Sequence, residues 1–461
     1  MKQVNRKQMD LGTGSVGRLL LSLSLPTITS QIVNMLYNLV DRVYIGHMEP
    51  AETVGQLALG GVGVCLPAIM IISAFAALLA MGGAPRASIA EGRGDLAESE
   101  RIMGNCFTML VTVGLVLTVV FRVFSRPILL TFGASENNIT YAVDYMNIYA
   151  LGTLFVLVTL GMNAYITAQG FTTISMCTVL IGAILNTILD PIFIFALDLG
   201  VRGAALATIC SQAVSAAWAL RFLLGPKTKW RLRRCNLRPR AQVVLPALAL
   251  GLSPFIMQST ESLIAVCFNR SLLRYGGDLA VSAMAVLISI MQFAMMPLQG
   301  LTQGAQPIIS FNFGARNPSR VRAAFWCLLR SCLVYSLTLW LVVQLVPSFF
   351  ARMFTPDAQL INYTAWALRI YMAAAGLFGI QIACQQTFVA LGNAKTSLFL
   401  AVLRKIILLI PLIYILPAFF TDKTFAVFLA EPVADILAVC TTAILFAIQF
   451  RRSMAELEQP K

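Results

Sequence analysis

The segment CFTMLVTVGLVLTVVF, residues 106–121, contains no charged side chain and is typical of the whole chain. Of the 461 residues, 58% are hydrophobic and only 12% are charged, whereas soluble domains carry about 25% charged residues. Uncharged runs of about twenty residues are long enough to cross a bilayer as α-helices. Outer-membrane barrels instead alternate apolar and polar residues over about ten positions. The sequence therefore predicts an all-α, polytopic membrane protein.

A search for apolar runs of spanning length predicts twelve transmembrane helices. Pro26 and Pro254 lie inside the first and seventh helices, where a missing backbone N–H permits bending, and both are predicted to be hinges. The predicted spans are residues 17–45, 53–81, 104–124, 139–167, 172–196, 203–224, 243–268, 280–310, 324–346, 361–390, 397–419 and 425–449.

Cysteine and histidine usage excludes two classes of site. The ten cysteines are scattered, mostly within apolar runs, and His47 is the only histidine. Neither a disulfide framework nor a conventional zinc site is expected. The polar, basic segment 1–18 leads into an apolar run without a small-residue cleavage site, so no cleavable signal peptide is expected.

The net charge of +14 is distributed as in a membrane protein, not as in a nucleic-acid-binding protein. With the N-terminus in the cytoplasm, the cytoplasmic segments hold 23 Lys and Arg and the outer loops hold seven. The positive-inside rule therefore places both termini in the cytoplasm, at the cell membrane. One loop is expected to attract anionic lipid because it concentrates seven cations without acidic neighbours in the sequence: Lys227, Lys229, Arg231, Arg233, Arg234, Arg238 and Arg240.

This loop divides the chain into similar halves. Matched residues recur at an offset of 222, which predicts a duplicated six-helix bundle with substrate held between the copies: Gly82, Pro85, Gly92, Phe132, Tyr149 and Gly170 match Gly304, Pro307, Gly314, Phe354, Tyr371 and Gly392. The predicted organisation is an N-terminal tail (1–16), an N-lobe (17–224), a basic linker (225–242), a C-lobe (243–449) and a C-terminal tail (450–461).

Four motifs resemble the multidrug and toxic compound extrusion (MATE) family. They are NMLYNLVDRVYIG at 34–46, LNTILDPIF at 185–193, VRGAALAT at 201–208 and QGAQP at 303–307. The resemblance covers essentially the whole chain and is strongest to the MepA-like branch. It implies a non-enzymatic, cation-driven exporter of amphipathic, often cationic, compounds with twelve helices in two lobes. It also implies a protein that acts as a monomer and needs no cofactor besides the coupling ion, Na⁺ or H⁺.

Acids inside apolar runs indicate a cation site. A charge at the bilayer centre costs at least ~2.5–3.5 kcal/mol, so Asp41 and Asp190 should face a cavity, an ion or a partner. Asn186 and Asp190 share one helical face and can offer oxygen ligands to a hard cation. The resemblance implies that Asp41, Asn186, Asp190 and Thr208 form this site. The plainer alternatives are that Arg42 pairs with Asp41 and that Asp190 caps an interruption before Pro191.

The second lobe gives a weaker signal. Glu261 is an intramembrane acid and a further candidate for cation coupling, but the tenth predicted helix lacks the acid that some family branches pair with it. Expected substrate contacts mix polar and adaptable apolar groups, although the methionines also suit core packing: Gln31, Asn34, Tyr37, Asn38, Gln258, Gln292, Met295 and Met296.

Two other functions compete. A flippase for a lipid-linked saccharide precursor would need clustered arginines to bind pyrophosphate. Only Arg42, Arg221, Arg330 and Arg369 are assigned to the membrane interior, with no cluster in the first, seventh or eighth span. An acidic interior favours exported cations instead. A membrane-embedded transferase would need a metal-binding acid cluster or an active histidine, and neither is evident. No P-loop is present, so ATP is not expected to be the direct fuel.

Overall fold

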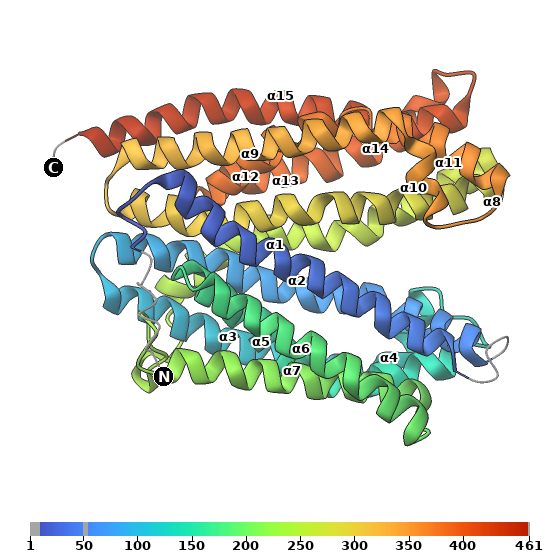
Figure 1. Cartoon of the computed structure of the whole chain (residues 1–461), viewed down its shortest axis with the longest axis horizontal. Coiled ribbons are helices and arrows are strands. Elements are labelled where there is room, and N and C mark those ends of the chain that lie inside the picture. The colour runs from blue at the N-terminus through green and yellow to red at the C-terminus, as the bar shows by residue number, and fades with distance from the viewer. Residues whose placement is uncertain (1–9, 49–53, 460–461) are drawn as a thin grey trace.

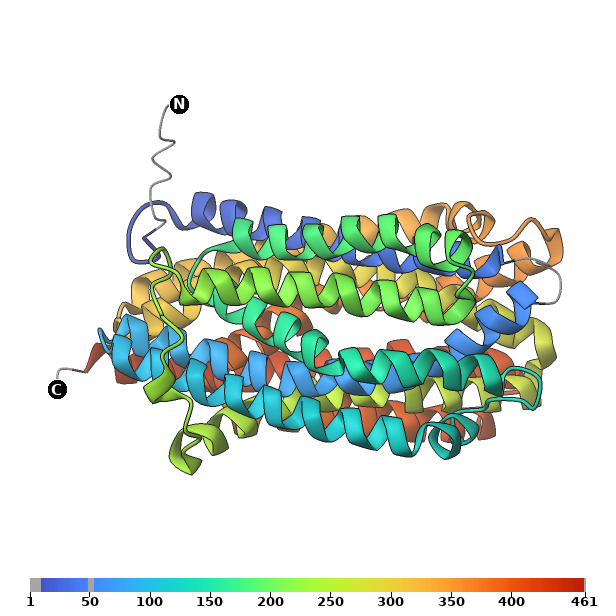
Figure 2. The same ribbon diagram turned by 90° about the horizontal axis from the view of Figure 1, so that it is seen from below.

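The computed structural model describes residues 10–48 and 54–459, which form two helical bundles lying side by side (Figure 1). Residues 1–9 of the predicted N-terminal tail and 460–461 of the predicted C-terminal tail lie outside the described residues. The start of the first helix and the end of the last lie at the same end of both bundles (Figures 1 and 2). We call this the terminal end.

The N-lobe contains the first half of the chain. Its helices are α1 (Val16–Gly46), α2 (Gln56–Gly92), α3 (Leu96–Val123), the short α4 (Ser125–Thr131), α5 (Ile139–Ala168), α6 (Thr172–Pro191) with its π-helical continuation η2 (Ile192–Ala196), and α7 (Gly200–Leu224). The linker that follows contains one 3₁₀ turn, η3 (Arg234–Asn236).

The C-lobe follows the same plan. Its helices are α8 (Ala241–Gly314), α9 (Pro318–Leu345), the short α10 (Pro347–Arg352), α11 (Ala358–Tyr371), η4 (Ala375–Leu377), α12 (Phe378–Ala390), α13 (Ala394–Val402), the π-helical η5 (Leu403–Leu409), α14 (Ile410–Ile415), η6 (Leu416–Ala418) and α15 (Lys423–Glu458). Within the described residues, α4 and α10 are short helices that hydropathy did not predict, and their starts are 222 residues apart.

The number of crossings agrees with the prediction. Ten helices among the described residues are long and apolar enough to span a membrane, and the α11–α12 pair, bent by 46°, makes an eleventh span. Helix α8 has 74 residues and breaks at Gly277, whose φ is 65°, so it crosses twice. The described residues therefore contain twelve crossings, but the tenth is bent rather than the single straight helix expected over 361–390.

Glycines of the repeat allow the lobes to approach closely at the terminal end. A Cβ on Gly82 of α2 would meet the backbone of Ala247 in α8, and a Cβ on Gly304 of α8 would meet the backbone of Ser24 in α1. Thr27 Oγ1 also donates to the Gly300 carbonyl at 2.6 Å. The glycines related by the 222-residue repeat thus lie at two equivalent helix crossings between the lobes.

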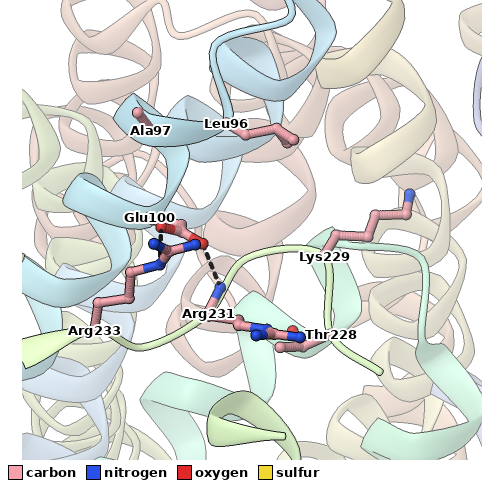
Figure 3. Close-up of a pocket in the computed structure, with 7 residues that line it drawn as sticks. All are labelled: Leu96, Ala97, Glu100, Thr228, Lys229, Arg231 and Arg233. Atoms are coloured by element: carbon pink, nitrogen blue, oxygen red, sulfur yellow. Dashed lines mark hydrogen bonds and ion pairs between the residues drawn. The ribbon is translucent and has the colours of Figure 1, made fainter. Parts of the chain in front are cut away.

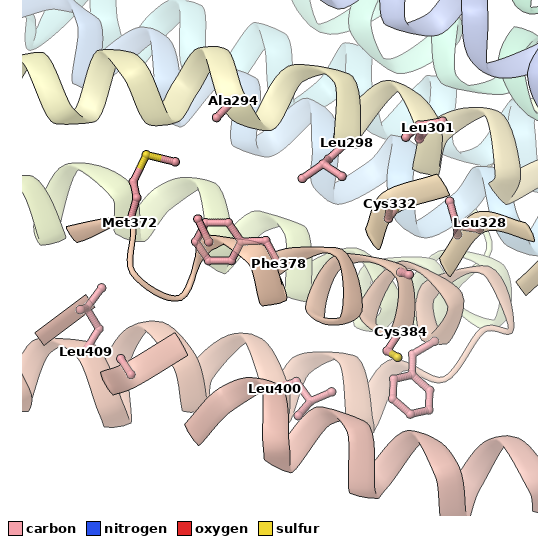
Figure 4. Close-up of a cluster of buried hydrophobic side chains, with 14 of the residues drawn as sticks. Ala294, Leu298, Leu301, Leu328, Cys332, Met372, Phe378, Cys384, Leu400 and Leu409 are labelled. Carbon is pink, nitrogen blue, oxygen red and sulfur yellow. The ribbon is translucent and has the colours of Figure 1, made fainter. Parts of the chain in front are cut away.

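Each lobe has its own apolar core, and the first turns of α1 and α8 cross over. Figure 4 shows part of the C-lobe core, where Leu298, Phe378 and Leu400 come from α8, α12 and α13. Leu20 and Leu23 of α1 are buried in this C-lobe core, whereas Ala247 of α8 is buried in the N-lobe core. Each lobe therefore contributes the first turns of one helix to the core of the other lobe.

Candidate functional site

The N-lobe encloses a buried acidic cluster toward the end opposite the terminal end. Asp190 of α6 is fully buried, Asn186 lies one turn before it, and Asp41 of α1 is 9% exposed. Asn186 Nδ2 donates to Asp190 Oδ1 at 3.1 Å. The carboxylates of Asp41 and Asp190 are near enough to repel each other. The structure thus brings together three of the four residues predicted for cation coupling.

Several buried oxygens of this cluster have no hydrogen-bond partner among the described residues. They are Asp41 Oδ1, Asn186 Oδ1, Asp190 Oδ2 and Gln212 Oε1. Buried polar atoms are nearly always satisfied, so four such acceptors in one region suit a bound cation or a shared proton. A hard cation prefers oxygen ligands of this type. The described residues contain no group of three His, Cys, Asp or Glu that could hold a metal ion, so neutral oxygens would have to complete a Na⁺ site.

Two tyrosines, Tyr145 and Tyr149, and Gln212 complete the cluster, although none of them was predicted to belong to it. Tyr145 of α5 interacts with Asp41 and with Thr208 of α7, and Tyr149 interacts with Tyr37 and Asp41. Two signals could have identified them. Tyr149 belongs to the 222-residue repeat, and Gln212 lies one helical turn after Thr208.

The plainer interpretations account for only part of what the structure shows. The charge of Arg42 acts on Asp41, but Arg42 is exposed and Asp41 Oδ1 has no hydrogen-bond partner in the described part of the chain. Helix α6 continues through Pro191 into η2, so Asp190 lies within a helical segment instead of capping a break. Thr208 Oγ1 donates to the Ala204 carbonyl of its own helix at 3.0 Å, which leaves its lone pairs available.

The C-lobe also contains acids within its spans, but here they meet cations. Lys405 Nζ lies 2.8 Å from Glu261 Oε1. The Arg404 guanidinium lies 2.7 Å from Asp435 Oδ1 and 3.5 Å from Glu431 Oε1. Glu261, the fifth predicted coupling residue, therefore belongs to an ion-pair network of the C-lobe and not to the N-lobe cluster.

The predicted inventory of cations inside the spans was incomplete. Arg404 and Lys405 were counted with the loop before the eleventh span, yet both lie in η5, well inside the span from Ala394 to Ala418. Their side chains are only 15% and 7% exposed. Two adjacent cations in an apolar run are the signal that could have found them.

The predicted substrate contacts lie on α1 and α8, in the parts that form spans 1, 7 and 8. Asn34, Asn38 and Gln292 are exposed, while Gln31, Gln258 and Met296 are half-buried. The remaining two have other neighbours: Tyr37 interacts with the acidic cluster, and Met295 packs against the C-lobe core. Of the predicted hinges, Pro26 lies within continuous α1, and Pro254 lies within α8 before its break.

The basic linker is held against the N-lobe at a surface pocket of about 390 Å³ (Figure 3). Gln169 Oε1 accepts bonds from Thr228 Oγ1 and from the backbone N–H groups of Lys229 and Trp230, at 2.7–3.0 Å. Lys229 pairs with Glu91 at 3.1 Å, and Arg233 pairs with Glu100 at 2.9 Å. The absence of acidic neighbours in the sequence was therefore misleading, because α2 and α3 supply them.

Similar proteins give a consistent picture. The MatE family model matches residues 26–192 and 254–415. The multidrug export protein MepA of Staphylococcus haemolyticus (strain JCSC1435) is 24% identical over 427 residues, which cover 92% of this chain and 93% of that protein. The MepA of Staphylococcus aureus (strain N315) is 24% identical over 432 residues, covering 93% and 94%.

Solved structures share the fold over nearly the whole length. The MATE multidrug transporter DinF-BH in complex with R6G is 33% identical, with a TM-score of 0.87 and coverage of 97% of this chain and 98% of that one. The outward-facing conformation of a multidrug resistance MATE family transporter, at 21% identity, has a TM-score of 0.89. This chain therefore belongs to the MATE family, in its MepA-like branch, and is a multi-pass membrane transporter rather than an enzyme.

Proposed function

We propose that this transporter exports amphipathic, often cationic, compounds from the cytoplasm in exchange for Na⁺ or H⁺ bound in the N-lobe. The observation that carries the proposal is the pair Asp41 and Asp190, which are buried together with unsatisfied oxygens and form no salt bridge within the described residues. Two bare carboxylates in a low-dielectric interior repel each other, so the site gains from binding one cation or sharing one proton.

Binding at this site would change the charge between two helices of the N-lobe. Asp41 lies on α1 and Asp190 on α6. Neutralisation removes the repulsion between these helices, and Pro26 leaves α1 able to bend in response. The bend would alter the exposed face of α1 that carries Asn34 and Asn38, where cargo is expected to bind.

The cargo class rests on the relatives and on the charge of the interior. The MepA proteins are named as multidrug exporters, and DinF-BH was solved with R6G. The cations Arg404 and Lys405 are both paired with acids, so they do not form the free arginine cluster that a pyrophosphate ligand would need. A flippase function therefore gains no support from them.

The proposed orientation places both termini in the cytoplasm of a cell-membrane protein that works as a monomer. The lobes then make their close contacts on the cytoplasmic side, and cargo leaves toward the outside. Five linker cations have no salt bridge within the described residues and are proposed to attract anionic lipid headgroups: Lys227, Arg231, Arg234, Arg238 and Arg240.

Transport by purified protein in proteoliposomes tests the function. An imposed Na⁺ or pH gradient is expected to move ethidium without ATP, and the two gradients applied separately identify the coupling ion. Asp41→Asn is expected to reduce this movement to that of empty liposomes, while Glu98→Gln, a change at a half-buried acid that pairs with Arg101 of the same helix α3, serves as the matched control. ATP-dependent movement that ignores both gradients would refute the proposal.

A further inference from the structure

Equivalent elements surround a charged cluster in each lobe. In the N-lobe the charged and polar groups come from α1, α5, α6 and α7. In the C-lobe they come from α8 (Glu261), α11 (Tyr371), η5 (Arg404 and Lys405) and α15 (Glu431 and Asp435). Tyr371 is the repeat partner of Tyr149, and it interacts with the C-lobe acids as Tyr149 does with Asp41.

The two clusters differ in what the fifth helix of each lobe contributes. In the N-lobe this helix is α6, which supplies Asn186 and the acid Asp190. In the C-lobe the equivalent span supplies Arg404 and Lys405 instead. Helix α12, next to them, adds Gln381 and Gln385, which bond to each other at 3.2 Å, and no carboxylate.

We propose that Lys405 is a resident cation for Glu261, so that the C-lobe uses a tethered ammonium where the N-lobe uses an exchangeable ion. Coupling is then confined to the N-lobe, and Glu261 does not bind the transported Na⁺ or H⁺. This inference rests on the proposed cation exchange and specifies which lobe performs it.

The geometry of the pair supports this role. The Lys405 side chain is 7% exposed, and its Nζ lies 2.8 Å from Glu261 Oε1, whereas the Glu261 side chain is 53% exposed. Glu261 lies near the middle of its span, where an exposed charge on the lipid side would be costly. One residue later, Ser262 Oγ lies 3.9 Å from Met70 Sδ of the other lobe, which places this region of α8 beside the N-lobe.

A tethered cation is hard for a free ion to displace. Lys405 is attached to the same lobe as Glu261, so its effective concentration at the carboxylate exceeds that of dissolved Na⁺ by the logic of linked binding. Arg404 reinforces the arrangement because it stays charged at every physiological pH and bonds to Asp435. The C-lobe acids therefore meet cations that cannot leave during a transport cycle.

Thermal unfolding of purified protein in detergent tests the proposal without any gradient. Asp41→Asn with Asp190→Asn silences the N-lobe site, and NaCl is exchanged for choline chloride at constant ionic strength. In this background no Na⁺-specific stabilisation is expected. Adding Lys405→Ala is expected to create stabilisation by Na⁺ or methylammonium, and adding Glu261→Gln as well should abolish it.

Two results would overturn the proposal. One is Na⁺-specific stabilisation in the Asp41→Asn, Asp190→Asn background that disappears with Glu261→Gln, because Glu261 would then bind Na⁺ beside Lys405. The other is a folded Lys405→Ala variant that gains no cation dependence.

Gradient-driven efflux gives a second test that tolerates poor folding of the single variants. Glu261→Gln leaves the buried ammonium of Lys405 unpaired, and Lys405→Met leaves the Glu261 carboxylate without its cation. Each single variant is expected to lower efflux by about tenfold, whereas the double variant should retain most of it. A well-folded double variant without efflux would show that Glu261 itself takes part in coupling. If the wild type responds to neither gradient, the proposed cation exchange is refuted. The unfolding experiment still tests the pairing of Lys405 with Glu261, because it uses no gradient.

Discussion

The N-lobe and the C-lobe both place acids within the membrane-spanning helices, but they differ in whether those acids form ion pairs. In the N-lobe, Asp41 and Asp190 are buried together and form no salt bridge within the described residues. In the C-lobe, Glu261 and Asp435 are each bonded to a cation of η5. The two bundles share their helix order and their glycine crossings, so the difference lies in a few side chains. Under the proposed exchange, a duplicated scaffold holds one cluster that depends on an external ion and one that does not.

Stability and transport should therefore respond differently to the same change in the two lobes. Removing a charge from an unpaired buried acid relieves an unfavourable interaction. Removing a charge from a buried ion pair leaves its partner uncompensated. The following predictions use this contrast, in order of decreasing effect.

Neutralising the N-lobe is expected to have the largest effect on transport. Asp190→Asn should reduce gradient-driven efflux to that of empty liposomes, because the site can no longer exchange a cation. Its unfolding temperature should equal or exceed that of the wild type, since the variant removes a buried, repelled charge. Ethidium efflux and differential scanning fluorimetry measure the two quantities. A variant with normal efflux would place coupling elsewhere and remove the contrast between the lobes.

Neutralising a cation of the C-lobe is expected to have the largest effect on stability. Arg404→Met leaves Glu431 and Asp435 buried without a partner, which should cost about 3–5 kcal/mol. Arg404→Lys keeps the charge but loses the planar fork, so it should cost less. Unfolding midpoints and the monodisperse fraction on size-exclusion chromatography measure the loss. An Arg404→Met protein as stable as the wild type would contradict the ion-pair network.

The glycine crossings should behave alike in both lobes. Gly82→Val and Gly304→Val each place a side chain against the backbone of the opposite lobe. Overpacking of this kind costs ~1–3 kcal/mol, which corresponds to roughly a 5- to 150-fold loss of the state closed at the terminal end. Efflux should fall similarly in both variants, with Gly63→Val, at a position with open space, as the control. A strong effect in one lobe only would show that the crossings are not equivalent.

The smallest expected effect concerns a feature of the N-lobe alone. Gln169 accepts three bonds from the linker, and its repeat partner in the C-lobe is Leu391. Gln169→Leu leaves buried donors unsatisfied and should lower stability by about 1–3 kcal/mol. Gln169→Glu retains an acceptor and should lose less. Thermal unfolding distinguishes the two, and equal stability of both variants would mean that the linker is held by other contacts.

Much of the fold was predictable because a bilayer restricts backbone structure to few solutions. Twelve crossings, two lobes and the junction at 225–242 followed from apolar runs and from the 222-residue offset. The ends of helices were less predictable. Helix α2 extends to Gly92, 11 residues beyond the predicted end at 81, because a helix continues past the apolar run where it packs on α8.

The N-lobe acids were predictable individually, since a charge within an apolar run requires a partner. Asn186 and Asp190 were also predictable as a pair, because the helical period places them on one face. Tyr145, Tyr149 and Gln212 were not predictable as members of this group, because such residues occur in many helices without any charge nearby.

The sequence by itself determined the membrane-spanning class, the duplication and the intramembrane acids Asp41 and Asp190, because hydropathy, offset and helical period are properties of residue order. Only the tertiary structure decided which acids form an ion pair with a basic side chain. Lys405 and Glu261 are 144 residues apart, and Arg404 and Asp435 are 31 apart. Ion pairs depend on distance in space, and the packing of η5 against α8 and α15 brings these groups together while leaving Asp41 and Asp190 unpaired.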